Sequence, residues 1–363
     1  MNITTLPHPS SYIPGLVLQS VLAEKSIETQ LEVSISTPSL KDNKPHLLLG
    51  YDKSKPDGKT ITLRMRGEVS SIALNVPLPL SVSIILESLS ILGDAAKALL
   101  AASVISGSNL YKDPDPLHTL NAKLNYGIDV SDRFLAFYAT GDYSIPDSLF
   151  STAIPFLPGL TGAGALDIID FVEKLGIKRD TTLFDMTTEK GRVLLEEVLK
   201  KINSRAKRIV PSNTLVSFLP HMVVEKKKID LRELATAIIL LMEASPGSLL
   251  DALSRNTIYP ILSEYYNLLE SASELIIDII EGRRLSFKTN LVITEDQHQG
   301  HGEVPIRYVS MALEFLGFID KNHVFAIESD GVVISSKPEL WAKQKMSKTM
   351  KATSVDHMHV IIE

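Results

Sequence analysis

Two residues with side chains suited to metal binding flank the first predicted helix and strands of the chain. His8 precedes a predicted helix over residues 12–25, and Asp52 follows the apolar run 46–50. A continuous apolar run of this length is typical of a strand buried on both faces of a parallel sheet. Open α/β sheets place ligand groups beyond the carboxyl ends of their strands, so Asp52 is well placed for a ligand. An imidazole and a carboxylate begin a metal site, but this stretch lacks the further ligands that such a site needs.

Each of these residues also has a plain structural explanation. His8 can cap or orient the first loop, and Asp52 can be a solvated aspartate at a strand end. Arg64 and Arg66 follow a predicted strand over 60–63 and alternate on one face of it. Because an arginine fork matches both carboxylates and phosphates, these two either pair with Asp52 inside the protein or bind phosphate. The internal ion pair is the preferred interpretation.

A lysine-rich segment near the end of the chain carries the clearest ligand-binding pattern. Residues 335–351, SSKPELWAKQKMSKTMK, contain five lysines against one glutamate, with Trp341 among them. Lysines meet phosphates and an aromatic face stacks on an unpaired base, so the segment is a candidate contact for single-stranded nucleic acid. The alternative is a solvated loop anchored by the tryptophan. The candidate residues, including two histidines near the expected last strand, are Ser335, Ser336, Lys337, Trp341, Lys343, Lys345, Lys348, His357 and His359.

The elements that position these residues alternate between strands and helices in the first third of the chain. Strands are predicted over 31–36, 46–50 and 60–63, followed by two helices that meet near Gly93. This order is the signature of an α/β sheet. The later predictions are helices over 189–205, from Asp230 and over 254–281, a strand over 291–294, a helix over 306–316, and strands over 324–328, 332–335 and 359–362.

Two helices of the middle region carry more specific predictions. Asp230 is the predicted N-cap of its helix, with Glu233 three residues later completing a pattern like a capping box. The basic run 226–228 is placed in the loop before that helix. The helix over 254–281 is long and amphipathic, and we expect it to be a spacer between domains, bent at Pro260.

The composition is that of a globular protein and excludes several classes of chemistry. The chain has 363 residues, of which 44% are hydrophobic and 22% are charged, and its net charge is -6 at pH 7. This charge argues against a surface that binds nucleic acid everywhere, but it allows a local basic patch. The absence of cysteine excludes disulfides, thiolate metal sites and cysteine nucleophiles. The sequence shows no signal-peptide pattern and no apolar run of membrane length, so we expect a cytoplasmic protein.

In its order of elements, the chain resembles the DHH phosphoesterase superfamily. Within it the chain resembles the RecJ-like branch, most of all the catalytically degenerate archaeal cell-division-cycle-45 replication proteins. The family's first motif, H-x-D-x-D, is HPSSY here, which keeps the histidine and loses both aspartates. The naming motif Asp-His-His falls on Arg-Met-Arg, and a serine takes the place of the fourth aspartate. The positions that match the family's active site are His8, Ser10, Tyr12, Asp52, Arg64, Met65, Arg66 and Ser106.

The resemblance extends to the end of the chain and implies a division into three parts. The stretch 334–339 is similar to the family's serine-arginine substrate motif, and 356–363 stands where the family has its G-G-H motif. The implied class is α/β. Its parts are a parallel-sheet DHH-like lobe over 1–205, a helical connector over 206–285 and a small mixed-sheet DHHA1-like domain over 286–363.

The replaced positions argue against catalysis. A two-metal phosphodiesterase holds its ions a few ångströms apart between bridging carboxylates, whose charge offsets that of the cations. Arg64 or Arg66 beside two divalent ions costs Coulomb energy at any plausible dielectric constant. We therefore expect a degenerate phosphoesterase without enzymatic activity, without a metal and without a cofactor.

The function that the resemblance implies is that of a non-catalytic subunit of the replicative helicase assembly. The implied partners are the ring-shaped minichromosome-maintenance helicase and the GINS complex, with single-stranded DNA as a further ligand, no membrane, and a nucleoid-associated location. One alternative is a manganese-dependent single-strand DNA exonuclease or phosphodiesterase of the same superfamily with altered ligands. Another is a single-strand binding module that works alone, which a steep salt dependence of binding would favour.

Overall fold

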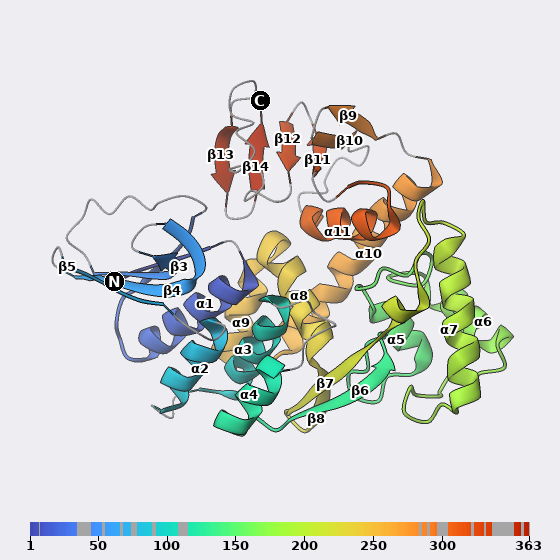
Figure 1. The fold of residues 1–363 in the computed structure, drawn as a ribbon, viewed down its shortest axis with the longest axis horizontal. Coiled ribbons are helices and arrows are strands. Elements are labelled where there is room, and N and C mark those ends of the chain that lie inside the picture. The colour runs from blue at the N-terminus through green and yellow to red at the C-terminus, as the bar shows by residue number, and fades with distance from the viewer. Residues whose placement is uncertain are drawn as a thin grey trace.

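The strands of the protein form three sheets around a central group of helices (Figure 1). The computed structural model describes residues 1–6, 8–34, 45–52, 55–65, 68–73, 78–88, 92–107, 115–282, 285–288, 291–295, 304–320, 323–329, 332–335, 352–356 and 359–362. None of the helices in these ranges combines the length and the apolar content that a membrane crossing needs.

The first sheet has the strand order β2-β1-β3-β4-β5. Its strands are β1 (Asn2–Thr5), β2 (Gln30–Val33), β3 (His46–Asp52), β4 (Lys55–Met65) and β5 (Glu68–Ala73). The first three are parallel to one another, as predicted, but β4 and β5 are antiparallel to their neighbours. The prediction of a wholly parallel sheet is therefore wrong. The chain turns back directly after Asp52, whereas a parallel neighbour requires a long crossover connection.

Helix α1 (Pro9–Glu24) connects β1 to β2 and packs against β1, β2 and β3. It begins three residues before the predicted start, with Pro9 in the first turn, where a missing N–H costs nothing. Ser11 Oγ donates to the Leu49 carbonyl at 2.6 Å and fixes the start of the helix to β3. Gly15 permits the close approach to the sheet, because a Cβ there would overlap Thr5 Cγ2 of β1.

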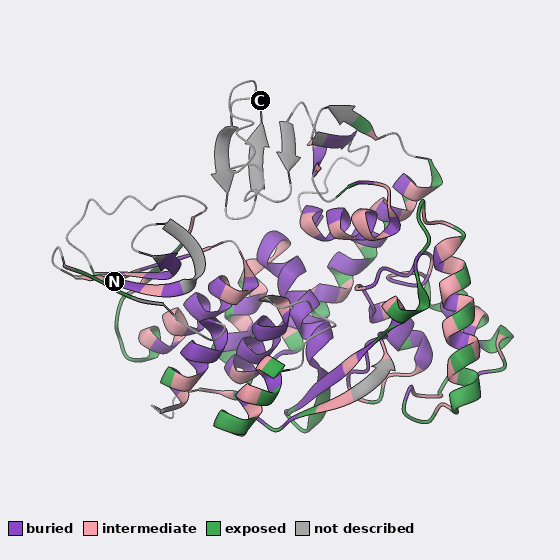
Figure 2. Cartoon of the chain, in the orientation of Figure 1, coloured by how far each residue is buried: buried purple, intermediate pink, exposed green. Residues whose placement is uncertain are grey.

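The centre of the molecule is helical. The helices are α2 (Leu78–Ser88), α3 (Asp94–Gly107), α4 (Asp115–Leu124), α8 (Leu231–Ala244), α9 (Pro246–Arg255) and α10 (Tyr259–Glu281). Helix α8 lies at the middle, with α3, α9 and α10 packed against it, and every residue from Leu231 to Glu243 is buried (Figure 2). A helix that is enclosed on all sides is a core element rather than a surface helix.

The prediction of one helix over 254–281 is wrong, because the chain forms two helices there. Asn256 ends α9 in the left-handed conformation, with φ 50°, and Pro260 lies in the first turn of α10 instead of bending a continuous helix. The Asn256 side chain accepts a hydrogen bond from the Ala95 N–H at 3.1 Å, which joins this break to α3. Helix α10 buries its apolar face in the core, so it is not a spacer.

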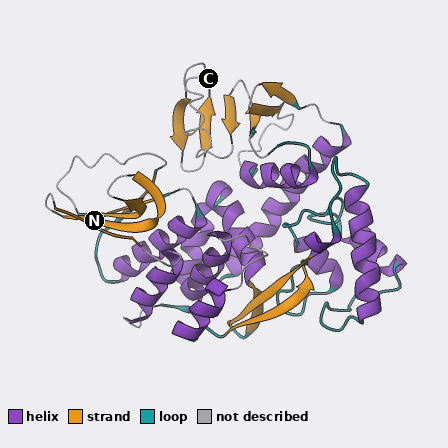
Figure 3. Ribbon diagram, viewed as in Figure 1, coloured by secondary structure: helices purple, strands orange, loops and turns teal. Residues whose placement is uncertain are grey.

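A small antiparallel sheet, β6-β7-β8, lies on one side of the central helices (Figure 3). Its strands are β6 (Ile128–Leu135), β7 (Val216–Val224) and β8 (Lys227–Asp230). Between β6 and β7 the chain forms α5 (Ile145–Ser151), α6 (Ala165–Lys174), α7 (Thr188–Asn203) and the 3₁₀ helix η1 (Ser212–Leu215). Helix α7 confirms the helix that was predicted over 189–205. The lysines at 227 and 228 lie in β8 rather than in a loop, so that prediction is wrong.

The last sheet has the order β13-β14-β12-β11-β10-β9 and is mixed, as predicted. Its strands are β9 (Ser286–Lys288), β10 (Leu291–Glu295), β11 (Val324–Ser329), β12 (Val332–Ser335), β13 (Ala352–Asp356) and β14 (His359–Ile362), and α11 (Ile306–Leu316) joins β10 to β11. Strands β10 and β11 are parallel, and the other neighbours are antiparallel. Helix α11 packs on β11 and also on α8 and α10.

One hydrophobic cluster runs through all three of the predicted parts. It extends from Ile13 of α1 through α8 and α10 to Ile327 of β11. Strand β6, from the predicted lobe, pairs with β7, from the predicted connector. The parts share one core, and whether 1–205, 206–285 and 286–363 fold as separate units stays a prediction.

Candidate functional site

The carboxyl edge of the first sheet brings together several of the predicted site residues. The parallel strands β1, β2 and β3 end there, and α1 begins there. His8 is the N-cap residue of α1, and its Nδ1 accepts a hydrogen bond from the Ser10 N–H at 3.2 Å. The Ser10 hydroxyl lies 2.7 Å from the same nitrogen. The prediction that His8 caps the first loop is therefore confirmed.

His8 lies in a buried environment near the positive charge of Arg307. Burial and the positive charge of Arg307, in the first turn of α11, lower the pKa of His8 to about 4. Arg307 is positioned through its backbone N–H, which donates to the Glu243 carboxylate at 2.9 Å. Burial also raises the pKa of Tyr12 to about 12. The starts of α1 and α11 and the end of α8 thus meet around a neutral imidazole.

Asp52 and Arg64 lie at opposite ends of the β3–β4 ladder. Asp52 ends β3 at the carboxyl edge and pairs with Lys55, whereas Arg64 pairs with His46 at the other end of β3. The predicted ion pair between Asp52 and the arginines is therefore wrong for Arg64, because β4 runs antiparallel. Met65 is the last residue of β4, and Arg66 lies outside the described residues.

Ser106 lies within the last turn of α3, and its hydroxyl donates to the Ser103 carbonyl at 2.9 Å. In the described ranges, no group of three or more histidine, aspartate or glutamate side chains is arranged to hold a metal ion.

The predicted nucleic-acid contacts fall mainly on residues that the structure does not describe. Ser335 ends β12 and pairs with Val360, directly after His359, so the backbone places these two predicted residues on neighbouring strands. The others, Ser336, Lys337, Trp341, Lys343, Lys345, Lys348 and His357, lie outside the described residues. Nucleic-acid binding by this segment stays a prediction.

A buried ion pair lies at the start of α8. Asp230 caps the helix, as predicted, and its carboxylate accepts from the Arg232 N–H at 2.9 Å and from the guanidinium at 2.6 Å. The same guanidinium donates to the Phe137 carbonyl at 2.9 Å and to Ser217 Oγ at 2.5 Å. Both charged side chains have 0% exposure. A fully buried charge needs such a set of partners, and these partners join the segment just after β6 to β7 and α8.

Glu233 does not complete the predicted capping box, because its carboxyl group turns to other partners. It accepts hydrogen bonds from Thr140 and, at 3.1 Å, from the Tyr266 hydroxyl. Tyr143 and Tyr266 also bond to each other through their hydroxyl groups. Burial, reinforced by the negative charge of Asp230, raises the pKa of Glu233 to about 8. The carboxyl group is therefore mostly protonated and neutral near pH 7.

Above these tyrosines lies a cavity of about 790 Å³, which we call the lysine-bordered cavity. Three consecutive lysines of the β7–β8 hairpin border it, together with Tyr143, Tyr259 and Tyr266. The ammonium group of Lys227 lies 5.1 Å from the centre of the Tyr259 ring, and that of Lys228 lies 5.5 Å from the Phe184 ring. Cationic and aromatic groups of this kind suit an anionic, planar ligand.

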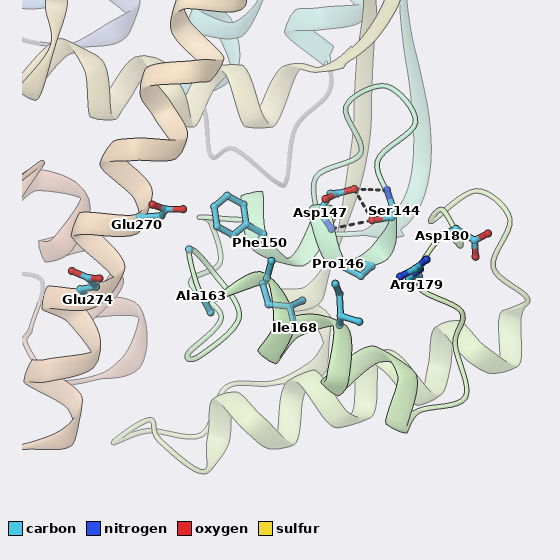
Figure 4. A pocket seen from close by; sticks show the side chains of 14 residues that line it. Ser144, Pro146, Asp147, Phe150, Ala163, Ile168, Arg179, Asp180, Glu270 and Glu274 are labelled. Atoms are coloured by element: carbon cyan, nitrogen blue, oxygen red, sulfur yellow. Dashed lines mark hydrogen bonds between the residues drawn. The ribbon is translucent and has the colours of Figure 1, made fainter.

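A second cavity, of about 760 Å³, lies further along α10, and we call it the carboxylate-bordered cavity. Figure 4 shows Glu270 and Glu274 on α10 at one side and Asp180 at the other, with Phe150 between them. Asp147 also borders it and forms a capping box with Ser144 at the start of α5. Arg179 is the cationic side chain among its lining residues.

Comparison with known proteins gives a match at the level of the fold. A scan against known family models and a search of curated proteins both found no match. Among solved structures, the model is similar to the crystal structure of CDC45 from Entamoeba histolytica. The TM-score is 0.60 and the sequence identity 9%, and the match covers 99% of this chain and 91% of that chain.

The chain has the CDC45 fold. This confirms, for the fold, the resemblance to RecJ-like cell-division-cycle-45 proteins that the order of elements indicates. The match leaves almost none of this chain uncovered, so it includes both its first and its last sheet.

The buried cluster around Glu233 and the two cavities have no local signature in the sequence. Glu233 and its partner Thr140 are 93 residues apart in the chain, and a helix-cap pattern explained the glutamate locally. The run 226–228 is visibly basic in the sequence, but the position of Lys227 over Tyr259 depends on the approach of the β7–β8 hairpin to α10. One signal was available: a glutamate inside the long apolar run of α8 needs a buried partner.

Proposed function

We propose that the protein is a non-catalytic structural subunit of a replicative helicase assembly. The observation that carries this proposal is the CDC45 fold over 99% of the chain. The shared feature is a whole arrangement of two outer sheets and a helical centre rather than one common motif. Such an arrangement offers several separate surfaces, which is what a subunit that bridges partners needs.

The carboxyl edge of the first sheet supports scaffolding over phosphodiester hydrolysis. Nδ1 of His8 is engaged by Ser10, and burial, together with the positive charge of Arg307, lowers the pKa of His8. A divalent cation beside a guanidinium costs Coulomb energy, and the described residues hold no group of three or more histidine, aspartate or glutamate side chains arranged to offset that cost. The capped imidazole and the nearby guanidinium therefore both disfavour a metal ion at His8.

The proposed partners are the minichromosome-maintenance helicase ring and the GINS complex. In this proposal the protein joins the two and stabilises the ring. It also guides a single strand through the lysine-rich segment 335–351. The mechanism is one of positioning, and it needs no chemical step on the DNA.

The test is reconstitution with the helicase ring and GINS complex of the same organism. We expect the three to co-elute in size-exclusion chromatography, and we expect unwinding of a forked DNA substrate to increase when this protein is added. A parallel assay on labelled single-stranded DNA with manganese tests the exonuclease alternative. Manganese-dependent cleavage that disappears in Asp52→Ala would overturn the scaffold and make the protein an enzyme. Failure to bind either partner would also overturn it.

A further inference from the structure

The residues that line the lysine-bordered cavity are distinct from those at the carboxyl edge of the first sheet. Its lining comes from the loop before α5, the β7–β8 hairpin and the first turns of α10. Its volume, about 790 Å³, falls within the ~300–1,000 Å³ that is typical of sites for small molecules and cofactors. It is therefore large enough to take a ligand rather than a few water molecules.

The hairpin that carries the lysines has an unusual backbone. Val224 pairs with Lys227, so Glu225 and Lys226 form a two-residue turn, and their φ angles are 51° and 66°. A turn with positive φ at both positions normally uses Asn-Gly, because other side chains are disfavoured there. Non-glycine residues in this conformation are strained, and such residues cluster at ligand-binding sites. The turn keeps a lysine where stability alone favours glycine.

The opposite wall supplies aromatic surface. Tyr259 is 48% exposed, although it is a large apolar ring at the start of a core helix. The Lys227 ammonium group, 5.1 Å from the centre of this ring, and the Lys228 ammonium group, near Phe184, form no ion pair in the part of the chain that the structure describes. A cation and an exposed ring thus stand side by side at the mouth of the cavity.

The groups at the floor of the lysine-bordered cavity do not repel an anion electrostatically. The hydroxyl groups of Tyr143 and Tyr266 meet there, and Glu233 lies behind them. Since burial raises the pKa of Glu233 to about 8, that carboxyl group is mostly uncharged near pH 7. Asp142 and Glu225 also border the cavity, so the lining has three lysines against two carboxylates. This balance predicts moderate rather than tight binding of an anion.

We propose that the lysine-bordered cavity binds a nucleotide, with its phosphate at the ammonium groups of Lys226, Lys227 and Lys228 and its base against Tyr259. The nucleotide is either free or one unit of a single strand, because both present the same phosphate and base. Lysines provide the charge for the phosphate, and a base stacks on an aromatic ring with little regard to its identity. The site does not depend on the helicase role, since the isolated protein contains all of it.

A nucleotide fits these features better than an acidic peptide does. A peptide segment would run along an extended groove and would use several carboxylates spaced along its length. The cavity instead combines one compact cluster of lysines with one exposed ring and two tyrosine hydroxyl groups. That set matches a ligand with a single anionic group and a single planar ring.

The experiment measures binding of thymidine 5′-monophosphate and of a six-residue oligothymidylate by calorimetry with the full chain. We expect both to bind the wild-type protein. The Lys227→Ala/Lys228→Ala variant should lose at least about tenfold in affinity for the mononucleotide, and Tyr259→Ala about fivefold, in line with ~1–3 kcal/mol per stacked base. Tyr259→Phe, which keeps the ring, should stay within about twofold. For the oligonucleotide, the salt slope should become shallower by ~0.7 for each lost contact.

Matched controls separate the site from general charge effects. Lys200→Ala removes an exposed lysine of α7, and Glu270→Gln changes the next cavity on the same helix; both should leave mononucleotide affinity within about twofold. Circular dichroism on each variant shows that it is folded. Binding that is unaffected by the Lys227, Lys228 and Tyr259 changes would overturn the proposal, and so would no binding at all. Preference of the same lysines for an eight-residue polyglutamate over both nucleotides would overturn it in favour of an acidic peptide.

Discussion

The two cavities along α10 have opposite charge although one face of one helix lines both. Tyr259 and Tyr266 border the lysine-bordered cavity, and Glu270 and Glu274 border the carboxylate-bordered cavity. These positions recur at spacings of four and seven, which places them on one face of the helix. The same loop also serves both cavities, with residues 140–143 at the first and Ser144 at the second.

The difference in charge between the two cavities comes from the elements that face α10. The β7–β8 hairpin brings its lysines to the first cavity, and α5 with the connection before α7 brings Asp147 and Asp180 to the second. The helix therefore provides a common wall, while local surface elements determine which ligands each cavity accepts. Phosphate-bearing ligands belong to the first cavity, because the carboxylates of the second repel them.

The largest expected effect comes from breaking the buried ion pair between Arg232 and Asp230, at the end of the β7–β8 hairpin. Arg232→Met leaves the Asp230 carboxylate buried without its partner and also removes the hydrogen bond to the Phe137 carbonyl. We expect the free energy of unfolding, measured with urea, to fall by about 3–5 kcal/mol. Affinity for nucleotides should fall as well, because the hairpin depends on this ion pair for its position.

A matched arginine on the surface is the control for that change. Arg192 forms an i,i+4 pair with Glu196 at 2.8 Å, but its side chain is 65% exposed. Arg192→Met should therefore change the free energy of unfolding by less than about 0.5 kcal/mol. Equal losses in the two variants would contradict the role assigned to the buried pair.

A pH series tests whether Glu233, behind the floor of the lysine-bordered cavity, is protonated in the folded protein. Burial holds the pKa of Glu233 at about 8 in the folded protein, above its ordinary value of 4.5. The folded state therefore binds a proton that the unfolded state has released. Its stabilising contribution is present at low pH and is lost as the pH rises from about 5 to 8, at about 1 kcal/mol per pH unit. Asp230, Arg232, Tyr143 and Tyr266 surround the group and stay unchanged in the test.

The measurement compares wild-type protein with Glu233→Gln in urea at about pH 5.5, 6.5 and 7.5. A glutamine keeps the shape of the side chain and cannot ionise, so the stability of the variant relative to the wild type should improve by about 2–3 kcal/mol across this range. A constant difference between the two proteins at all three values would show that Glu233 does not take up a proton on folding.

Elements with strong local patterns were predictable from the sequence. The helix over 306–316 and the last strand over 359–362 have the predicted bounds, and the apolar run 46–50 is the start of β3. These segments have clear periodicity or a continuous apolar run, and neighbouring residues alone produce that signal. Asp230 as an N-cap belongs to the same class, because a cap acts within one turn of its helix.

Features that depend on distant segments were not predictable. Pro56, Asp57 and Gly58 are residue types that favour a turn, yet they lie in β4, whose position depends on pairing with both β3 and β5. The antiparallel direction of β4 then separated Arg64 from Asp52. The lysine-bordered cavity joins three segments that are far apart in the chain, 140–143, 224–229 and 258–266, which no local window contains.

The smallest expected effect comes from changing the two turn residues of the β7–β8 hairpin, Glu225 and Lys226. Glu225→Asn/Lys226→Gly places the residues that favour positive φ at both turn positions, so the free energy of unfolding should rise by about 1 kcal/mol. Glu225→Asn alone keeps all three lysines and should give part of this gain with nucleotide affinity at least as high as in the wild type. The double variant should gain stability and lose affinity, because Lys226 is gone. If stability and affinity rise together in the double variant, Lys226 is not at the ligand, and Lys227 and Lys228 alone provide the charge.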